Sequence, residues 1–476
     1  MKKSQLVFVP VPGIGHLVSV VGFAKLILER DDSFLISMLV INNPYAPSIS
    51  NYVESLAAIH TQINFITIPE KVVEAPPLEV FVGRPESTFT QFLREHNPFI
   101  KDAIVNQVMA NSPVPIASVI VDLFCVSFID VAKELGVPSH VFFCSDAAFY
   151  GLMLYLSESE DKGEPKFRET DPHYIIPYYA NPVPYRVLPL LHRDTAYETF
   201  AWLGRKYKES NGIIINTFSE LESHAVRALV TRDDLPPTFT VGPIIDHKGK
   251  SLTGSEAAKC EEITKWLDDQ PEKSVVFLCF GSQGAMREAQ LKEIAIGLER
   301  SGHRFLWAVR KPPGPGEGLP GFYTSYDEIL PEEFLEKTKN IGMLCGWAPQ
   351  VQVLAHKAVG AFVSHCGWNS TLEALWSGVP IITWPCYGEQ HINAFQLVKD
   401  LGLAVELTLD FRKDSPTDFV KAEDITKAVK YVMEEGSEYR NRAEAASEMG
   451  RRALLEGGSS DVAFGRLIEQ WLRNKP

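Results

Sequence analysis

Short apolar segments alternate with helical patterns along both halves of the chain, and this alternation restricts the fold more than any other feature. Strands separated by helices predict a mostly parallel sheet covered on both faces, so each half is expected to be a doubly wound α/β domain. The predicted strands are 6–11, 34–41, 63–68, 118–123, 140–144, 213–218, 275–280, 305–309, 343–345, 361–364 and 381–384. The predicted helices include 17–29, 89–109, 129–135, 290–299 and 461–472, and 158–173 and 311–321 are predicted to be loops.

A polar, turn-rich stretch at 242–256 is predicted to link two domains. Two domains are expected on length alone, because 476 residues exceed what one hydrophobic core normally serves. The first is predicted at 1–243 and the second at 244–460, followed by a terminal helix within 461–476. Sheets of this kind bind ligands at the carboxyl ends of their strands, so we expect a cleft where the two domains face each other.

Charge and cysteine content exclude several classes of partner. The formal net charge of −14 argues against nucleic acids and anionic membranes. Seven cysteines, an odd number without a C-x-x-C pair, predict reduced thiols in a cytoplasmic protein. Prolines and glycines interrupt the first apolar segment early, and no apolar run reaches about 18 residues, so neither a signal peptide nor a membrane span is expected.

The segment Trp347–Gln390 has the pattern of a phosphate-binding turn. A strand leads into H-C-G-W-N-S and then into a helix, so free backbone N–H groups and the positive helix end meet at one place. His365 could donate to a phosphate oxygen, and Asn369 and Ser370 lie where a diphosphate would rest. Glu373 follows on the same helix face, and a carboxylate there suits a ribose diol.

Further residues of this half could complete the site. Trp347 offers a flat face for a base, with Gln350 beside it, while Glu389 and Gln390 could bind sugar hydroxyls. Ser282 belongs to a second small-residue turn, F-G-S-Q-G, for which an ordinary helix cap is the alternative interpretation. We expect structural roles for His356, Trp376 and Trp384.

His16 is the candidate general base of the first half. It follows the first predicted strand in P-G-I-G-H, and a histidine at a strand end has a pKa suited to taking a proton near neutral pH. Asp122 ends another apolar strand and could hold one imidazole nitrogen. A helix cap is the alternative for each residue.

A nicotinamide-dependent oxidoreductase is one alternative function, but the first-half turn fits it poorly. Val18 stands where G-x-G-x-x-G requires its third glycine, and Ile41-Asn42-Asn43 supplies no acid after the second strand.

The residues resemble the plant secondary-product UDP-glycosyltransferases. Trp347–Gln390 is similar to the signature segment of that family, with W-A-P-Q, H-C-G-W-N-S and E-Q in register, and V-F-V-P-V-P-G-I-G-H-L is similar to its N-terminal motif. The resemblance covers essentially the whole chain. It implies a GT-B fold, with an acceptor-binding first domain, a UDP-sugar-binding second domain and a terminal helix packed back on the first domain.

The resemblance also implies a role for each matching residue. His16 would be the base and Asp122 its partner. Trp347 would stack on uracil, and Gln350 and Glu373 would hold the ribose. Ser282, His365, Asn369 and Ser370 would hold the diphosphate, and Trp368, Glu389 and Gln390 the sugar. Cys144 departs from the pattern because it falls where a threonine is common, which leaves Ser145 as the alternative hydroxyl.

The predicted activity is inverting transfer of glucose from UDP-glucose to a hydroxyl of a flavonoid, another phenolic or a terpenoid, giving a β-glucoside. UDP-glucose is a co-substrate, and no metal or other cofactor is expected. Ile14, Phe124 and Phe149 are predicted to line the acceptor pocket. We expect a cytoplasmic monomer. Another UDP-sugar donor remains an alternative, and the acceptor and its reacting hydroxyl cannot be read from the sequence. A non-catalytic UDP-sugar-binding protein is the third hypothesis, and the pair of His16 and Asp122 argues against it.

Overall fold

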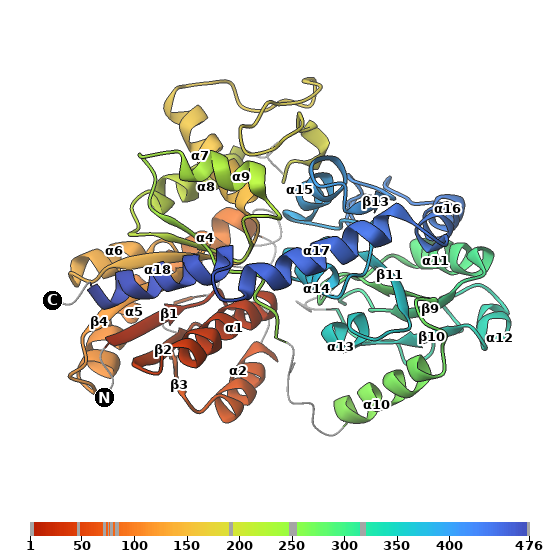
Figure 1. Cartoon of the computed structure of the whole chain (residues 1–476), viewed down its shortest axis with the longest axis horizontal. Helices are drawn as coiled ribbons and strands as arrows, with labels where there is room; N and C mark the ends of the chain where they lie inside the picture. Colours follow the sequence, from red (N-terminus) through yellow and green to blue (C-terminus); the bar gives the residue numbers. More distant parts are fainter. Residues whose placement is uncertain are drawn as a thin grey trace. The chain divides into compact units, whose positions relative to one another are not determined.

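A parallel β-sheet forms the centre of each of the two units into which the chain divides (Figure 1). The computed structural model describes residues 4–44, 48–69, 73–74, 76, 80, 85–189, 194–246, 255–314 and 320–473. Unit 1 comprises Met1–Tyr185, Leu190–Asp246 and Arg452–Pro476, and unit 2 comprises Arg186–Pro189 and His247–Arg451. Within the described ranges, no helix is long and apolar enough to cross a membrane.

The sheet of unit 1 has seven parallel strands in the order β3-β2-β1-β4-β5-β6-β7. All residues of β1, β4 and β5 are buried, as expected for parallel strands with helices on both faces. The strands are β1 Ser4–Val9, β2 Phe34–Val40, β3 Ile63–Thr67, β4 Ile116–Asp122, β5 Ser139–Phe143, β6 Ile213–Ile215 and β7 Thr238–Thr240. The helices are α1 Ile14–Arg30, α2 Ser48–Ile59, α4 Pro85–Glu95, α5 Asn97–Ala103, α6 Phe128–Glu134, α7 Ala147–Asp161, α8 Asp194–Tyr207, α9 Ser223–Val230 and α18 Ser459–Arg473.

The sheet of unit 2 has six parallel strands in the order β10-β9-β8-β11-β12-β13. The two sheets confirm the predicted fold class, two parallel-sheet α/β domains. The strands are β8 Val275–Cys279, β9 Arg304–Ala308, β10 Gly342–Cys345, β11 Val359–Ser364, β12 Ile381–Thr383 and β13 Ala404–Glu406. The helices are α10 Ser255–Asp268, α11 Glu288–Ser301, α12 Phe334–Thr338, α13 Gln350–Leu354, α14 Trp368–Trp376, α15 Gln390–Phe395, α16 Ala422–Met433 and, ending across the unit boundary, α17 Glu438–Leu454.

The direction of the strand order reverses once in each sheet. In unit 1 the reversal lies between β1 and β4, and in unit 2 it lies between β8 and β11. Doubly wound sheets bind ligands at such a reversal, beyond the carboxyl ends of the two strands. The topology alone therefore directs attention to the residues that follow β1, β4, β8 and β11.

Several predicted boundaries were wrong. The helix predicted over 89–109 is divided into α4, α5 and a π-helix, Ile104–Met109. The break falls before α5 because Pro98, near its start, has no N–H group to continue α4. At the break, the ring of His96 hydrogen-bonds the Phe92 carbonyl at 2.8 Å. The predicted loop 158–173 begins inside α7. The end of the predicted linker, from Ser255, belongs to α10, and its part at 247–254 lies outside the described residues, as does 315–319 of the second predicted loop.

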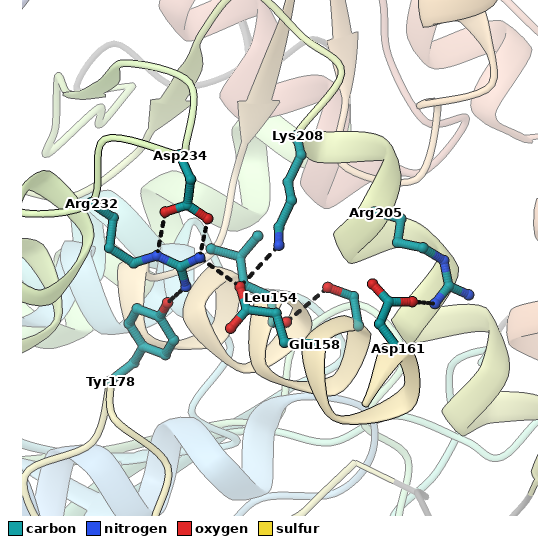
Figure 2. Close-up of polar contacts among 9 residues, drawn as sticks. Leu154, Glu158, Asp161, Tyr178, Arg205, Lys208, Arg232 and Asp234 are labelled. Atoms are coloured by element: carbon teal, nitrogen blue, oxygen red, sulfur yellow. Dashed lines mark hydrogen bonds and ion pairs between the residues drawn. The ribbon is translucent and has the colours of Figure 1, made fainter. Parts of the chain in front are cut away.

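A group of charged side chains ties the end of α7 to two loops of unit 1 (Figure 2). Glu158 accepts from Lys208, after α8, and from Arg232, after α9, at 2.9 and 2.7 Å. Arg232 also pairs with Asp234 and donates to the hydroxyl of Tyr178 at 3.0 Å. Because the Glu158 carboxylate pairs with two cations, it links the end of α7 to the segments that follow α8 and α9.

The terminal helix α18 packs on the sheet of unit 1 through Trp471. This side chain is fully buried, and its ring makes edge contacts with His140 and Phe34 at centroid distances of 5.7 and 6.0 Å. Its indole N–H points to the His140 ring nitrogen at 3.4 Å. At the start of the helix, Ser460 donates to the Gly242 carbonyl at 2.5 Å.

Replacing Trp471 by alanine is expected to destabilise unit 1 by about 3–5 kcal/mol, because it removes a fully buried aromatic side chain. Chemical unfolding followed by circular dichroism measures the loss. The control is Arg473→Ala on the same helix, whose side chain is 79% exposed and pairs with nearby Glu469. Equal stability of the two variants would contradict the anchoring role of Trp471.

Candidate active site

Three side chains meet beyond the carboxyl ends of adjacent strands in unit 1. His16 lies in the first turn of α1, shortly after β1, while Asp122 ends β4 and Cys144 follows β5. These three strands are neighbours in one parallel sheet, so their ends lie at the same edge. The site therefore collects residues separated by more than a hundred positions in the chain.

His16 and Asp122 form a close pair. The Nδ1 atom of His16 lies 3.0 Å from both carboxylate oxygens of Asp122. The Asp122 side chain is fully buried, whereas 27% of the His16 side chain is exposed. Burial by itself lowers the pKa of His16, but the carboxylate of Asp122 and the sulfur of Cys144 outweigh it, so that the pKa is raised well above its usual value.

Cys144 is the contact of His16 that sequence patterns do not predict. Its Sγ atom lies 3.2 Å from Nδ1 of His16, on the nitrogen that also faces Asp122. The hydroxyl of Ser145, the alternative at this position, donates instead to Asp146 at 3.1 Å. The one signal available in the sequence was the place of Cys144, directly after a strand adjacent to the one that Asp122 ends.

The three predicted acceptor residues lie in different surroundings. Ile14 is half-buried at the start of α1, and the half-buried ring of Phe124 lies 6.1 Å from that of His16. Phe149, by contrast, is buried in α7, with its ring near Phe143 and Phe200. Ile14 and Phe124 are thus placed beside the candidate base, while Phe149 contributes mainly to packing.

The H-C-G-W-N-S segment of unit 2 forms a tight turn between β11 and α14. The hydroxyl of Ser364 accepts from the backbone N–H of Cys366 at 3.0 Å, and Cys366 adopts a left-handed backbone with φ of 62°. Gly367 then stands at the N-terminal end of α14, where it makes no side-chain cap. The first N–H groups of this helix, from Trp368 to Ser370, lie at its positive end, where helices bind anions.

His365 lies between two glycine backbones. A Cβ atom on Gly281, after β8, would be 2.7 Å from Nε2 of His365, and one on Gly367 would be 2.6 Å away. Burial lowers the pKa of His365 to about 4, so the imidazole is neutral near pH 7. Its Nδ1 atom is buried and has no hydrogen-bond partner in the part of the chain that the structure describes. It is therefore a polar atom suited to a ligand.

Gln350, Ser370 and Glu373 form a second polar cluster. The side-chain amide of Gln350, at the start of α13, donates to the Ser370 hydroxyl at 2.8 Å and to the Glu373 carboxylate at 2.7 Å. The structure therefore brings together two residues expected to hold a ribose and one expected to hold a diphosphate. Trp347, three residues before Gln350, is half-buried, as required of a ring that one face of a ligand could cover.

The residues expected to hold the sugar differ in burial and in the hydrogen bonds that they already make. The side-chain oxygen of Gln390 accepts from the backbone N–H groups of Cys386 and Tyr387 at 3.0 and 3.1 Å, so only its amide nitrogen could serve a ligand. Glu389 is half-buried at the N-terminal end of α15, and Trp368 is buried in the first turn of α14.

Ser282 is exposed in an irregular loop after β8. Helix α11 begins only at Glu288, with Arg287 as its N-terminal cap residue. Ser282 is therefore not the cap of a following helix, which was the alternative interpretation of this turn.

The residues expected to be structural make structural contacts. Trp384 is fully buried against Phe280 and Phe411. Trp376 packs under the guanidinium of Arg451, and His356 hydrogen-bonds Asp268 at 3.1 Å.

Comparison with known proteins gives similarity over the whole chain. The family described as "UDP-glucoronosyl and UDP-glucosyl transferase" matches residues 220–451. The chain is 46% identical to UDP-glycosyltransferase 71K2 of Pyrus communis, over 98% of each sequence, and 44% identical to UDP-glucose flavonoid 3-O-glucosyltransferase 6 of Fragaria ananassa, over 98% of this chain and 99% of the relative. Among solved structures, Medicago truncatula UGT71G1 complexed with UDP-glucose matches with a TM-score of 0.88 and 41% identity, over 99% of this chain and 98% of the other.

Gly281→Ala is expected to weaken the binding of UDP by about tenfold or more, because an added methyl group would displace His365 as well as strain a backbone with φ of 74°. Isothermal titration calorimetry with UDP measures the effect. Gly302→Ala is the matched control, since its φ is 71° but no atom of the described residues lies within 4 Å of the added atom. Equal UDP affinity in the two variants would show that the position of His365 is unimportant.

Proposed function

The chain belongs to the plant UDP-glycosyltransferases, enzymes with the GT-B fold, and we propose that it transfers glucose from UDP-glucose to a hydroxyl of a small lipophilic acceptor with inversion at the anomeric carbon. The observation that carries this proposal is the pair of His16 and Asp122 at the strand reversal of unit 1. Unit 2 supplies the polar atoms for a nucleotide at its own reversal.

His16 acts as the general base in this proposal. The Asp122 carboxylate accepts a hydrogen bond from Nδ1 and so holds the single proton of the neutral imidazole there, which leaves Nε2 free to take a proton. The acceptor hydroxyl gives its proton to Nε2 while its oxygen attacks the anomeric carbon. The bond from that carbon to UDP breaks on the opposite face, so an α-linked donor yields a β-glucoside. Asp122 then stabilises the imidazolium.

In this proposal, polar groups of unit 2 stabilise the departing UDP. The N–H groups at the start of α14 are candidates to meet the diphosphate, and so is Nδ1 of neutral His365, which has no hydrogen-bond partner among the described residues. The side chains of Ser282 and Asn369 are further candidates. Glu373, oriented by Gln350, is the candidate to accept from the ribose hydroxyls. Donors fixed before the reaction can stabilise charge as it develops.

Glucose is the proposed sugar, and the names of similar proteins support it. The Medicago truncatula structure holds UDP-glucose, and the Fragaria ananassa relative is a UDP-glucose flavonoid 3-O-glucosyltransferase. The same names support a flavonoid or another phenolic as acceptor. We further propose that the protein works as a monomer in the cytoplasm, and its seven free cysteines support a reducing compartment.

Mass spectrometry of the products tests the reaction. The purified protein is incubated with UDP-glucose, UDP-galactose or UDP-glucuronic acid and a mixed panel of flavonoids, simple phenols and terpenoid alcohols. The proposal expects hexose addition with UDP-glucose and a β-linkage by NMR. Preference for another donor would overturn the sugar assignment, and an α-linkage would overturn inversion.

His16→Ala is expected to lower kcat by about 100-fold to 10,000-fold, because it removes the proton acceptor. The affinity for UDP, measured by calorimetry, should stay unchanged, since the nucleotide is assigned to unit 2. His60→Ala in the same unit is the control and should keep wild-type turnover. Near-normal glucosylation of a phenol by His16→Ala would show that another group is the base.

Asp122→Asn tests the proposed origin of the raised His16 pKa. The base must be unprotonated, so activity should rise with pH through this pKa, and the acidic limb of the wild-type kcat/KM profile should lie above that of an ordinary histidine. Loss of the carboxylate should move the limb to lower pH and reduce the plateau by about 100-fold to 10,000-fold. If the acidic limb of Asp122→Asn lies at the same pH as that of the wild type, the pKa seen in the profile does not belong to His16.

A further inference from the structure

We infer that His16, Asp122 and Cys144 together form an inhibitory site for one thiophilic divalent cation such as Zn²⁺. One imidazole nitrogen, one carboxylate oxygen and one sulfur all lie within 4.8 Å of one another. This is the set of ligand types that zinc takes in proteins, with three from the protein and a fourth position left for solvent. The inhibitory effect rests on the proposed role of His16, whereas the binding itself does not.

The observed distances fit such a site after small shifts. Nδ1 of His16 lies 3.0 Å from the Asp122 oxygens and 3.2 Å from Sγ of Cys144. In a tetrahedral site with bonds of about 2.0 Å to nitrogen and oxygen and about 2.3 Å to sulfur, neighbouring ligand atoms lie about 3.3–3.6 Å apart. The imidazole of His16 would thus need to move a few tenths of an ångström away from the carboxylate and the sulfur.

Access and charge also favour a cation at this place. Asp122 is fully buried and Cys144 nearly so, while 27% of the His16 side chain is exposed and leaves a route for the ion. A carboxylate and a thiolate neutralise a divalent ion, so the bound site carries no net charge. The soft sulfur ligand selects Zn²⁺, Cd²⁺ or Co²⁺ over the hard ion Mg²⁺.

Binding would disable the base through a proton shift. The cation occupies Nδ1, so the one proton of the neutral imidazole must move to Nε2, the atom proposed to receive the acceptor proton. The Cys144 thiol releases its proton to solvent when sulfur binds the metal. Inhibition therefore needs no contact between the ion and either substrate, and a chelator should reverse it.

Cobalt spectroscopy tests the binding. Titration of the wild-type enzyme with Co²⁺ should produce a thiolate-to-cobalt charge-transfer band, and Zn²⁺ should remove it by displacement. The band should persist in Cys260→Ser, a control that removes a half-buried thiol of unit 2, and should be absent from Cys144→Ser. Cys144→Thr is a second variant in case the serine variant folds poorly.

Inhibition is measured as the ratio of turnover with and without Zn²⁺ in each variant, so a change in basal activity does not affect it. Wild type and Cys260→Ser should be inhibited reversibly, while Mg²⁺ has no effect. Cys144→Ser and Cys144→Thr should need about 10-fold to 100-fold more Zn²⁺, since even an outer-shell change costs that much affinity.

Two results would overturn the inference: no charge-transfer band in the wild type, or a band that survives both changes at Cys144. A band that depends on Cys144 without inhibition by Zn²⁺ would have a different meaning. It would keep the cation site and overturn the assignment of His16 as the base.

Discussion

The pairing of β1, β4 and β5 is the constraint on which the candidate active site depends. Val9 lies opposite Val121, and Asp122 lies opposite Phe142, so the three strands end at nearly the same level. A slip of one residue would turn Asp122 to the other face of the sheet and break its contact with His16. The buried apolar residues of these strands fix the register, and the hydrophobic core thereby positions the polar pair.

The two histidines of the candidate sites illustrate opposite uses of burial. His16 keeps part of its side chain in solvent and lies beside a buried carboxylate, so its pKa rises. His365 is packed between two glycine backbones, and burial lowers its pKa. The first is suited to accept a proton, whereas the second can only donate or accept a hydrogen bond as a neutral group. The two histidines thus differ in role because their surroundings differ, although the residue type is the same.

The sequence predicted what depends on local pattern. Apolar periodicity identified most of the strands, and the small-residue turns after β1, β8 and β11 identified where polar side chains gather. The edge strands β7 and β13 were missed because Thr-Phe-Thr and Ala-Val-Glu lack the continuous apolar run that marked the equally short β6 and β12. The contact of Gln350 with Ser370 and Glu373, and the use of the Gln390 oxygen by backbone N–H groups, depend on side-chain directions that no spacing encodes.

Cys144 shows how a single side chain can change the chemistry of a site. The resemblance to the family places a threonine at this position more often. A hydroxyl there could hydrogen-bond a substrate but would be a weak ligand for zinc, whereas a thiol is a poor hydrogen-bond donor and a strong metal ligand after it loses its proton. Because Sγ lies 3.2 Å from the candidate base, a cysteine in place of threonine trades a substrate contact for sensitivity to cations. The same convergence of strand ends that makes His16 a base thus also exposes it to capture by a metal.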